Sequence, residues 1–139
     1  YLLKLKEEID PLPLIMEFRR LDWQTVPVYS FLQQNNISFV CVDEPQLGEL
    51  MKPAVVKTSD IFYLRFHGRN RAKWWNHKKP YERYDYLYDQ DELQQWLPDL
   101  GKLLQKDGTF FISFNNHFQA QAVLNARMME TILKGVLAQ

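Results

Sequence analysis

The segment IFYLRFHGR, residues 61–69, predicts a β-strand with different chemistry on its two faces. The segment is rich in β-branched and aromatic residues, which favour strands. Because side chains alternate along a strand, Leu64 and Phe66 share one face, whereas Arg65 and His67 share the other. One face is therefore suited to packing against helices, and the opposite face becomes polar where the strand ends.

Three other segments resemble this strand in composition and in the position of their polar residues. They are residues 14–19 (LIMEFR), 37–43 (ISFVCVD) and 109–115 (TFFISFN). Apolar spacings and capping residues predict helices over residues 1–9, 25–34 and 91–105, and a last helix from about residue 119 onward. Pro98 is expected to interrupt the third of these helices. Strands that alternate with helices predict an α/β fold with a parallel sheet.

The polar strand faces favour a TIM-like (β/α) barrel over a doubly wound sheet. In a doubly wound sheet helices cover both faces, and the strands are almost wholly apolar. In a barrel the functional groups lie at the C-terminal ends of the strands. We therefore expect six polar side chains to converge there, namely Glu17, Arg19, Asp43, Arg65, His67 and Asn115. The same alternation turns Cys41 into the barrel, where it is interpreted as a small core residue.

The overall charge is balanced, but it is unevenly distributed along the chain. The chain has 139 residues, of which 17 are basic and 17 acidic, so a polycation or an acidic tail is excluded. Residues 61–90 nevertheless carry seven basic and three acidic side chains, a net of +4, together with Trp74, Trp75 and five of the seven tyrosines. Basic groups attract phosphate or carboxylate, and aromatic rings stack on bases or sugars. The loop over residues 69–88 is therefore predicted to contact an anionic ligand, and a solvated lid is the alternative.

Several classes of protein are excluded by what the sequence lacks. No apolar run approaches the roughly 18 residues of a membrane span, and the charged opening YLLKLKEEID lacks the features of a signal peptide. The single cysteine, Cys41, excludes an internal disulfide and a multi-cysteine zinc site. It favours a reducing compartment, and we predict a cytoplasmic protein.

The candidate site combines acid–base groups with groups that hold an anion. Glu17, Asp43 and His67 are the candidates for proton transfer. The candidates for substrate binding are Arg19, Arg65, Arg69, Tyr84, Tyr86, Asn115 and Asn116. Three alternatives stay open: the charges could be internal ion pairs, the two asparagines could only hold a turn, and the histidines with the two carboxylates could bind a divalent metal. Because no close His-x-x-x-His spacing is present, the sequence assigns no metal ligand.

Several motifs occur in an order that is typical of one family. They are Glu17-Phe18-Arg19 with Trp23, Asp43 with Pro45, Arg65 with His67-Gly68-Arg69, Tyr84-Asp85-Tyr86 with Tyr88, Glu92-Leu93 with Trp96, and Asn115-Asn116-His117 followed by Gln121-Ala122 and Asn125-Ala126. On these residues the chain resembles the YecE-like proteins, domain of unknown function family 72 (DUF72). The resemblance implies a TIM-like barrel, with residues 1–139 as its C-terminal half and about four of its β/α units. Ala120 departs from the glycine that the family favours at that position.

The resemblance implies no settled reaction, so the functional hypotheses are based on the candidate site residues. The first is an enzyme, a hydrolase acting on a phosphoester or nucleic acid. Arg19 and Arg65 would hold the anion, and His67 with Glu17 or Asp43 would transfer protons. The alternatives are a non-catalytic barrel that binds nucleic acid or a nucleotide, and an interaction scaffold whose charges are internal pairs. The sequence assigns neither a cofactor nor an oligomeric state.

Overall fold

The structure is a computed structural model, and it describes residues 1–137. Its strands are β1 (Ile15–Met16), β2 (Ser38–Asp43), β3 (Ile61–Phe66) and β4 (Thr109–Phe114). Its α-helices are α1 (Leu2–Ile9), α2 (Val26–Gln34), α3 (Gln90–Gln94), α4 (Leu97–Leu104) and α5 (Gln121–Leu137). Short 3-10 turns lie at Leu21–Trp23, Pro80–Tyr84 and Phe118–Ala120.

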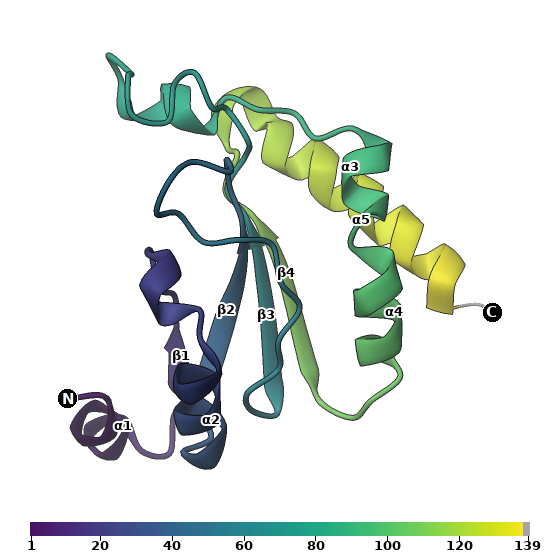
Figure 1. Cartoon of the computed structure of the whole chain (residues 1–139). Helices are drawn as coiled ribbons and strands as arrows, with labels where there is room; N and C mark the ends of the chain where they lie inside the picture. Colours follow the sequence, from purple (N-terminus) through teal and green to yellow (C-terminus); the bar gives the residue numbers. More distant parts are fainter. Residues whose placement is uncertain (138–139) are drawn as a thin grey trace.

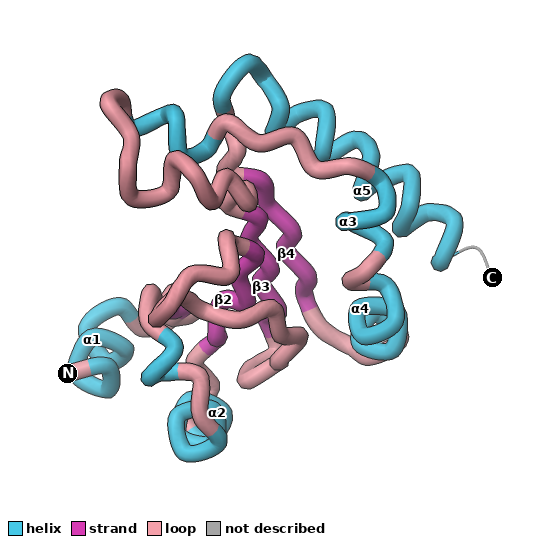
Figure 2. Tube along the Cα trace, turned by 45° about the horizontal axis from the view of Figure 1, so that its top comes forward, coloured by secondary structure: helices cyan, strands magenta, loops and turns pink. Residues whose placement is uncertain are grey.

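The strands form one parallel sheet in the order β1-β2-β3-β4, so each strand lies beside its predecessor in the chain (Figure 1). Helices α3, α4 and α5 lie together on one side of the sheet (Figure 2). The predicted α/β class and parallel sheet are confirmed. Within residues 1–137 the sheet is not closed, because β1 and β4 form its two edges. The described chain is therefore not by itself a barrel.

Local sequence signals set the helix ends. Asp89 accepts a hydrogen bond from the Glu92 backbone N–H at 2.8 Å, and the Glu92 carboxylate accepts one from the Asp89 N–H at 3.1 Å. This reciprocal pair starts α3. Pro98 lies in the first turn of α4, where a missing N–H removes no helical hydrogen bond. The predicted helix over residues 91–105 is therefore two helices.

β1 is shorter than the predicted strand over residues 14–19. Its ladder with β2 covers Ile15 and Met16. Beyond Met16 the side chains of Glu17 and Arg19 bond to groups of β3 and of the residue that follows it. The polar half of this segment thus serves as a connection at the C-terminal end of the sheet.

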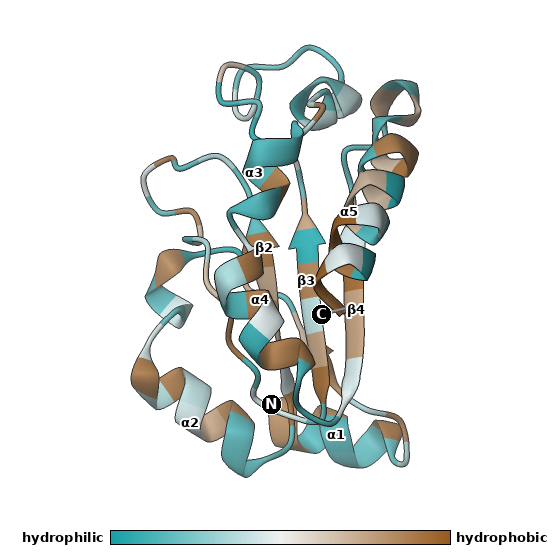
Figure 3. Ribbon diagram, turned by 90° about the vertical axis from the view of Figure 1, so that its right-hand side faces the viewer, coloured by the Kyte–Doolittle hydropathy of each residue, from teal (hydrophilic) through white to brown (hydrophobic). Residues whose placement is uncertain are grey.

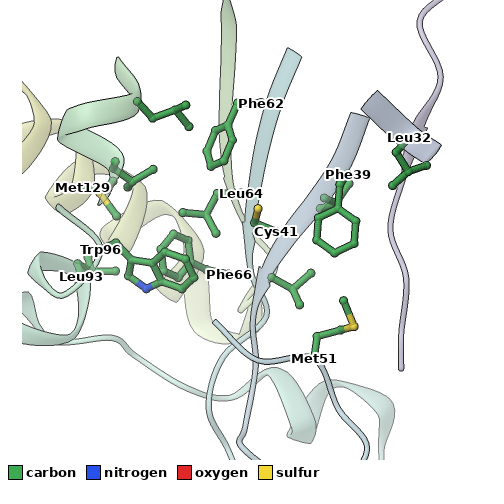
Figure 4. Close-up of a cluster of buried hydrophobic side chains, with 14 of the residues drawn as sticks. Leu32, Phe39, Cys41, Met51, Phe62, Leu64, Phe66, Leu93, Trp96 and Met129 are labelled. Carbon is green, nitrogen blue, oxygen red and sulfur yellow. The ribbon is translucent and has the colours of Figure 1, made fainter. Parts of the chain in front are cut away.

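The core lies between the sheet and the helices (Figure 4). Phe62, Leu64 and Phe66 of β3 are completely buried. The Trp96 ring packs edge-on against the Phe66 ring, with the two ring centroids 5.6 Å apart. Each such side chain contributes about 1.5–3 kcal/mol through burial. The sheet face that carries these three side chains of β3 is called the outer face.

The opposite surface of the sheet, which we call the inner face, carries Tyr63 and Arg65. β3 is apolar along most of its length and turns polar at its tip (Figure 3). The register pairs Val42 with Arg65 and Asp43 with Phe66. Partners on neighbouring strands share a face, so Asp43 lies on the outer face.

The predicted faces of β2 are therefore wrong. Asp43 does not share a face with Arg65, and Cys41, which pairs with Leu64, also lies on the outer face. All six residues of β2 are buried, so its alternation of residue types carries no information about which face meets water. The irregular connection over residues 44–60 covers Cys41, whose Sγ accepts a hydrogen bond from the Val56 N–H at 3.3 Å.

Candidate functional site

A cluster around Glu17 lies at the C-terminal end of the inner face. The Glu17 carboxylate accepts hydrogen bonds from the guanidiniums of Arg19 and Arg65, the latter at 2.9 Å. His67 Nε2 lies 3.1 Å from the same carboxylate and 3.2 Å from an Arg19 nitrogen. We call these four residues together with Asn115 the inner cluster. Because two guanidiniums share one carboxylate, their formal charges leave an excess of +1.

Asn115 and Glu17 together favour one tautomer of neutral His67. The Asn115 side-chain nitrogen lies 3.2 Å from His67 Nδ1, and an amide N–H group can only donate. With Nδ1 accepting, the proton of neutral His67 lies on Nε2, where it is donated to Glu17. The imidazole is therefore oriented from one side by an amide and from the other by a carboxylate.

The inner cluster shifts the pKa values of its acid and its base. Burial opposes ionisation of Glu17, but its bonds to His67 and to the two guanidiniums outweigh burial and lower its pKa to about 2. Burial lowers the pKa of His67; Glu17 opposes this shift, and the charges of Arg19 and Arg65 add to it. At neutral pH the cluster therefore holds an ionised carboxylate and a neutral imidazole.

Exposure differs sharply within the inner cluster. The side chains of Arg19 and Arg65 are 47% and 36% exposed, whereas those of Glu17 and His67 are 18% and 2% exposed. A ligand that approaches the sheet therefore meets the guanidiniums first. His67 can act only through Glu17 in this arrangement.

Aromatic rings from the loop over residues 69–88 stand beside His67. The ring centroids of Tyr84 and Trp74 lie 6.4 and 6.5 Å from that of His67. Tyr84 also contacts His117, with centroids 5.3 Å apart. Tyr84 thus borders the inner cluster on the His67 side. The loop over residues 69–88 extends above the strand ends in Figure 1.

A second carboxylate–arginine cluster lies on the outer face. Asp43 is fully buried, and its two oxygens accept bonds from Arg69 at 2.6 and 2.8 Å, from the Tyr88 hydroxyl at 2.8 Å and from the Trp96 indole N–H at 3.2 Å. Arg69 also donates to Glu92 at 3.2 Å. We call these five residues the outer cluster. Asp43 and Arg69, both predicted site residues, thus lie apart from the inner cluster and hold the helix layer to the sheet.

Tyr86 and Asn116 also belong to the helix side of the sheet. The Tyr86 hydroxyl donates to Glu92 at 2.5 Å. Asn116 is fully buried, and its side-chain nitrogen donates to the Tyr86 carbonyl at 2.7 Å and to the Asn125 side-chain oxygen at 2.8 Å. Asn125 in turn binds the backbone of Tyr88. These asparagines fasten the end of the long loop to α5, as side-chain to backbone bonds do in turns.

Comparison with known proteins places this fold and these motifs in one family. A family model described as protein of unknown function DUF72 matches residues 1–138. The chain belongs to the DUF72 family. The resemblance to YecE-like proteins, which rested in part on Asn115, Asn116 and the Arg65–Arg69 run, is thereby confirmed.

Relatives of this DUF72 chain are about twice as long as the chain. UPF0759 protein YunF of Bacillus subtilis (strain 168) is 34% identical over 148 residues, which cover 96% of this chain and 51% of YunF. Crystal structures of DUF72 proteins from Thermotoga maritima and Enterococcus faecalis match 96% of this chain with TM-scores of 0.87 and 0.85. They are 39% and 28% identical to it, and the match covers 50% and 52% of their lengths.

Glu44 is a buried carboxylate beside the two clusters of this DUF72 chain that the sequence reasoning missed. It directly follows β2, and the charges of Arg19, Glu17 and Asp43 act on it. It is almost fully buried; its Oε1 accepts from the Met51 N–H at 2.9 Å, and its Oε2 has no hydrogen-bond partner among the described residues. Burial raises the pKa of Glu44, although the nearby Arg19 opposes the shift. The register of β2 against β3 was the missing signal, because residue order alone favours Asp43.

The proposed metal alternative lacks a ligand set in this part of the family fold. Asp43 and Glu17 lie on opposite faces of the sheet. Among residues 1–137, no three His, Cys, Asp or Glu side chains come together as a site that could hold a metal ion.

Among residues 1–137, no helix is both long and apolar enough to span a membrane.

Proposed function

We propose that this DUF72 chain supplies the anion-binding side of an enzyme site that acts on phosphoesters. One observation carries the proposal: Arg19 and Arg65 share a single carboxylate and remain open to solvent where parallel strands end. Paired guanidiniums match the oxygens of a phosphoryl group.

The lone cysteine suits a reducing, cytoplasmic setting, which stays a prediction.

The same geometry suggests how an anion could activate the site. A phosphoryl group that binds Arg19 and Arg65 competes with Glu17 for their N–H groups. As Glu17 loses these bonds, the effect of burial dominates and its pKa rises. Glu17 then becomes able to accept a proton, while His67 holds it in place from the opposite side. Anion binding to the two guanidiniums is thus coupled to the ability of Glu17 to accept a proton.

We further propose that residues 1–139 form the C-terminal half of a TIM-like barrel. The half-length match to the DUF72 relatives supports this arrangement. So does the inner face, where the Phe111 side chain of β4 is 48% exposed. In a closed barrel the remaining strands would pack against this face, and the inner cluster would lie at the mouth.

The test is hydrolysis of a phosphoester panel by the full-length protein. We expect turnover of p-nitrophenyl phosphate or bis(p-nitrophenyl) phosphate, with Arg65→Ala and His67→Ala each abolishing it while circular dichroism stays unchanged. Arg127→Ala, on the exposed surface of α5, is the matched control and should keep full activity. Absence of turnover across the panel with every divalent metal tried would reject the enzyme.

The non-catalytic alternative is binding of nucleic acid or a nucleotide through the basic loop over residues 69–88. The loop has exposed Arg71 and Lys79, and it carries Trp75, which is 66% exposed. Such binding should weaken steeply with salt. Retained, salt-dependent binding without turnover would favour this alternative. The scaffold alternative would gain if neither anion binding nor turnover were found.

A further inference from the structure

An open cavity lies next to the inner cluster, and the loops after three successive strands line it. Its volume is about 440 Å³. Arg19 and Arg20 come from the connection after β1, the loop over residues 47–50 follows β2, and Trp75 comes from the loop after β3. Ligand pockets usually fall in the range of about 300–1,000 Å³. The cavity is therefore large enough for a small organic molecule.

Trp75 gives the cavity an aromatic wall that is held in place. Its side chain is 66% exposed, whereas the neighbouring Trp74 is buried and lies edge-on to it with the ring centroids 6.5 Å apart. The Arg83 guanidinium lies 6.0 Å from the centroid of the Trp75 ring. An indole that is supported by these two groups yet largely uncovered offers a surface on which another ring can stack.

The rest of the lining combines apolar side chains with an ion-paired arginine, and Arg19 links it to the inner cluster. Leu47 and Leu50 contribute apolar surface. Arg20 is paired with Glu49 at 2.7 Å and with Asp22 at 3.0 Å, so these three side chains carry a formal net charge of −1 and Arg20 has no unpaired positive charge. Arg19 lines the same cavity and reaches Glu17 in the inner cluster. The cavity thus joins an aromatic wall to the proposed anion site through a single guanidinium.

We propose that this cavity, between Trp75, the loop over residues 47–50 and Arg19, is a ring-binding subsite of the anion site. The inference rests on the proposed function, and it narrows the substrate class to phosphoesters that carry a planar aromatic or heteroaromatic group. The phosphoryl group binds Arg19 and Arg65, and the ring stacks on Trp75. The leucines exclude water from the other side of the ring.

The test compares two probes, inorganic phosphate and phenyl phosphate, by calorimetric titration of the full-length protein. We expect phenyl phosphate to bind on the order of tenfold more tightly than inorganic phosphate, as stacking on one ring allows. Trp75→Ala should remove this preference and leave the affinity for inorganic phosphate unchanged. Trp75→Phe, the matched control, keeps a ring at the same place and should retain most of the preference.

The outcomes separate the subsite from the anion site. Equal binding of the two probes by the unaltered protein, or a preference that survives Trp75→Ala, overturns the ring subsite and leaves the anion site intact. Arg65→Ala should weaken both probes together. If neither probe binds the unaltered protein, the anion site itself is rejected, and the subsite with it.

Discussion

The two faces of the sheet end in two clusters of similar composition and different character. On the outer face, Asp43 is completely buried and accepts four hydrogen bonds, two of them from Arg69. On the inner face, Glu17 is shared by Arg19 and Arg65, both of which remain partly exposed. Each cluster pairs a carboxylate with arginine at the same end of the same strands.

The difference lies in how fully the donors and acceptors are used. A buried carboxylate is stable only when its charge and lone pairs are compensated, and Asp43 meets that condition. The inner cluster has more positive charge than its carboxylate neutralises, and water reaches its guanidiniums. A saturated, closed cluster is suited to holding structure, whereas an open cluster with spare donors is suited to binding.

The largest effect is expected from Asp43→Ala. The substitution leaves Arg69 without its main partner and removes the acceptor for the Tyr88 hydroxyl and the Trp96 N–H, all near the core. Breaking a buried pair from one side costs about 3–5 kcal/mol. Chemical denaturation should show a loss of this size in the free energy of unfolding. Arg65→Ala, which removes a partly exposed arginine of the inner cluster, should cost no more than about 1 kcal/mol. Equal losses would contradict the distinction between the two clusters.

A smaller effect is expected from Tyr88→Phe. The Tyr88 hydroxyl accepts from the Gly68 N–H and donates to Asp43, both at 2.8 Å, so its removal leaves the Gly68 N–H without this partner and takes one of its four hydrogen bonds from Asp43. The expected loss is about 1–3 kcal/mol of unfolding free energy. Tyr84→Phe, on the inner side, should change stability by less than about 0.5 kcal/mol. The comparison would fail if the inner tyrosine proved the more costly one.

Sequence reasoning recovered the inner cluster better than the outer one, for reasons visible in the strands. In β3, half-buried and buried residues alternate, so Arg65 could be assigned to a face from the pattern. In β2 every residue is buried, so the pattern could not tell Asp43 from Glu44. Their faces depend on register against β3, which is a tertiary property.

Some residues were predicted as one group although the structure divides them. Glu17, Arg19, Arg65, His67 and Asn115 come together in the inner cluster, and Tyr84 lies beside it. Asp43, Arg69, Tyr86 and Asn116 lie on the helix side. Asn115 and Asn116 show why, because adjacent residues at a strand end face opposite ways. The family motifs span both faces and therefore mix binding residues with packing residues.

Glu17→Gln is expected to strengthen anion binding. The change removes the one carboxylate that competes with an anion for Arg19 and Arg65, and raises the excess charge from +1 to +2. Inorganic phosphate should bind several-fold more tightly, which corresponds to about 1 kcal/mol. Calorimetric titration at two salt concentrations measures this effect, and the variant should be the more salt-sensitive of the two. Weaker binding would mean that Glu17 itself orients the guanidiniums toward the anion.

The smallest expected effect is the pH dependence of the inner cluster. The pKa of His67 is lowered from 6.5, chiefly by burial, so folding favours its neutral form. Its contribution to stability is therefore fully present above pH 6.5 and is lost as the pH falls through its folded pKa. Glu17, with a pKa of about 2, does not titrate in that range. The difference in unfolding free energy between the unaltered protein and His67→Gln should shrink as the pH is lowered from 7 to 5. A constant difference would show that His67 keeps the same protonation preference in the folded and unfolded chain, and that the inner cluster does not sense pH through its imidazole.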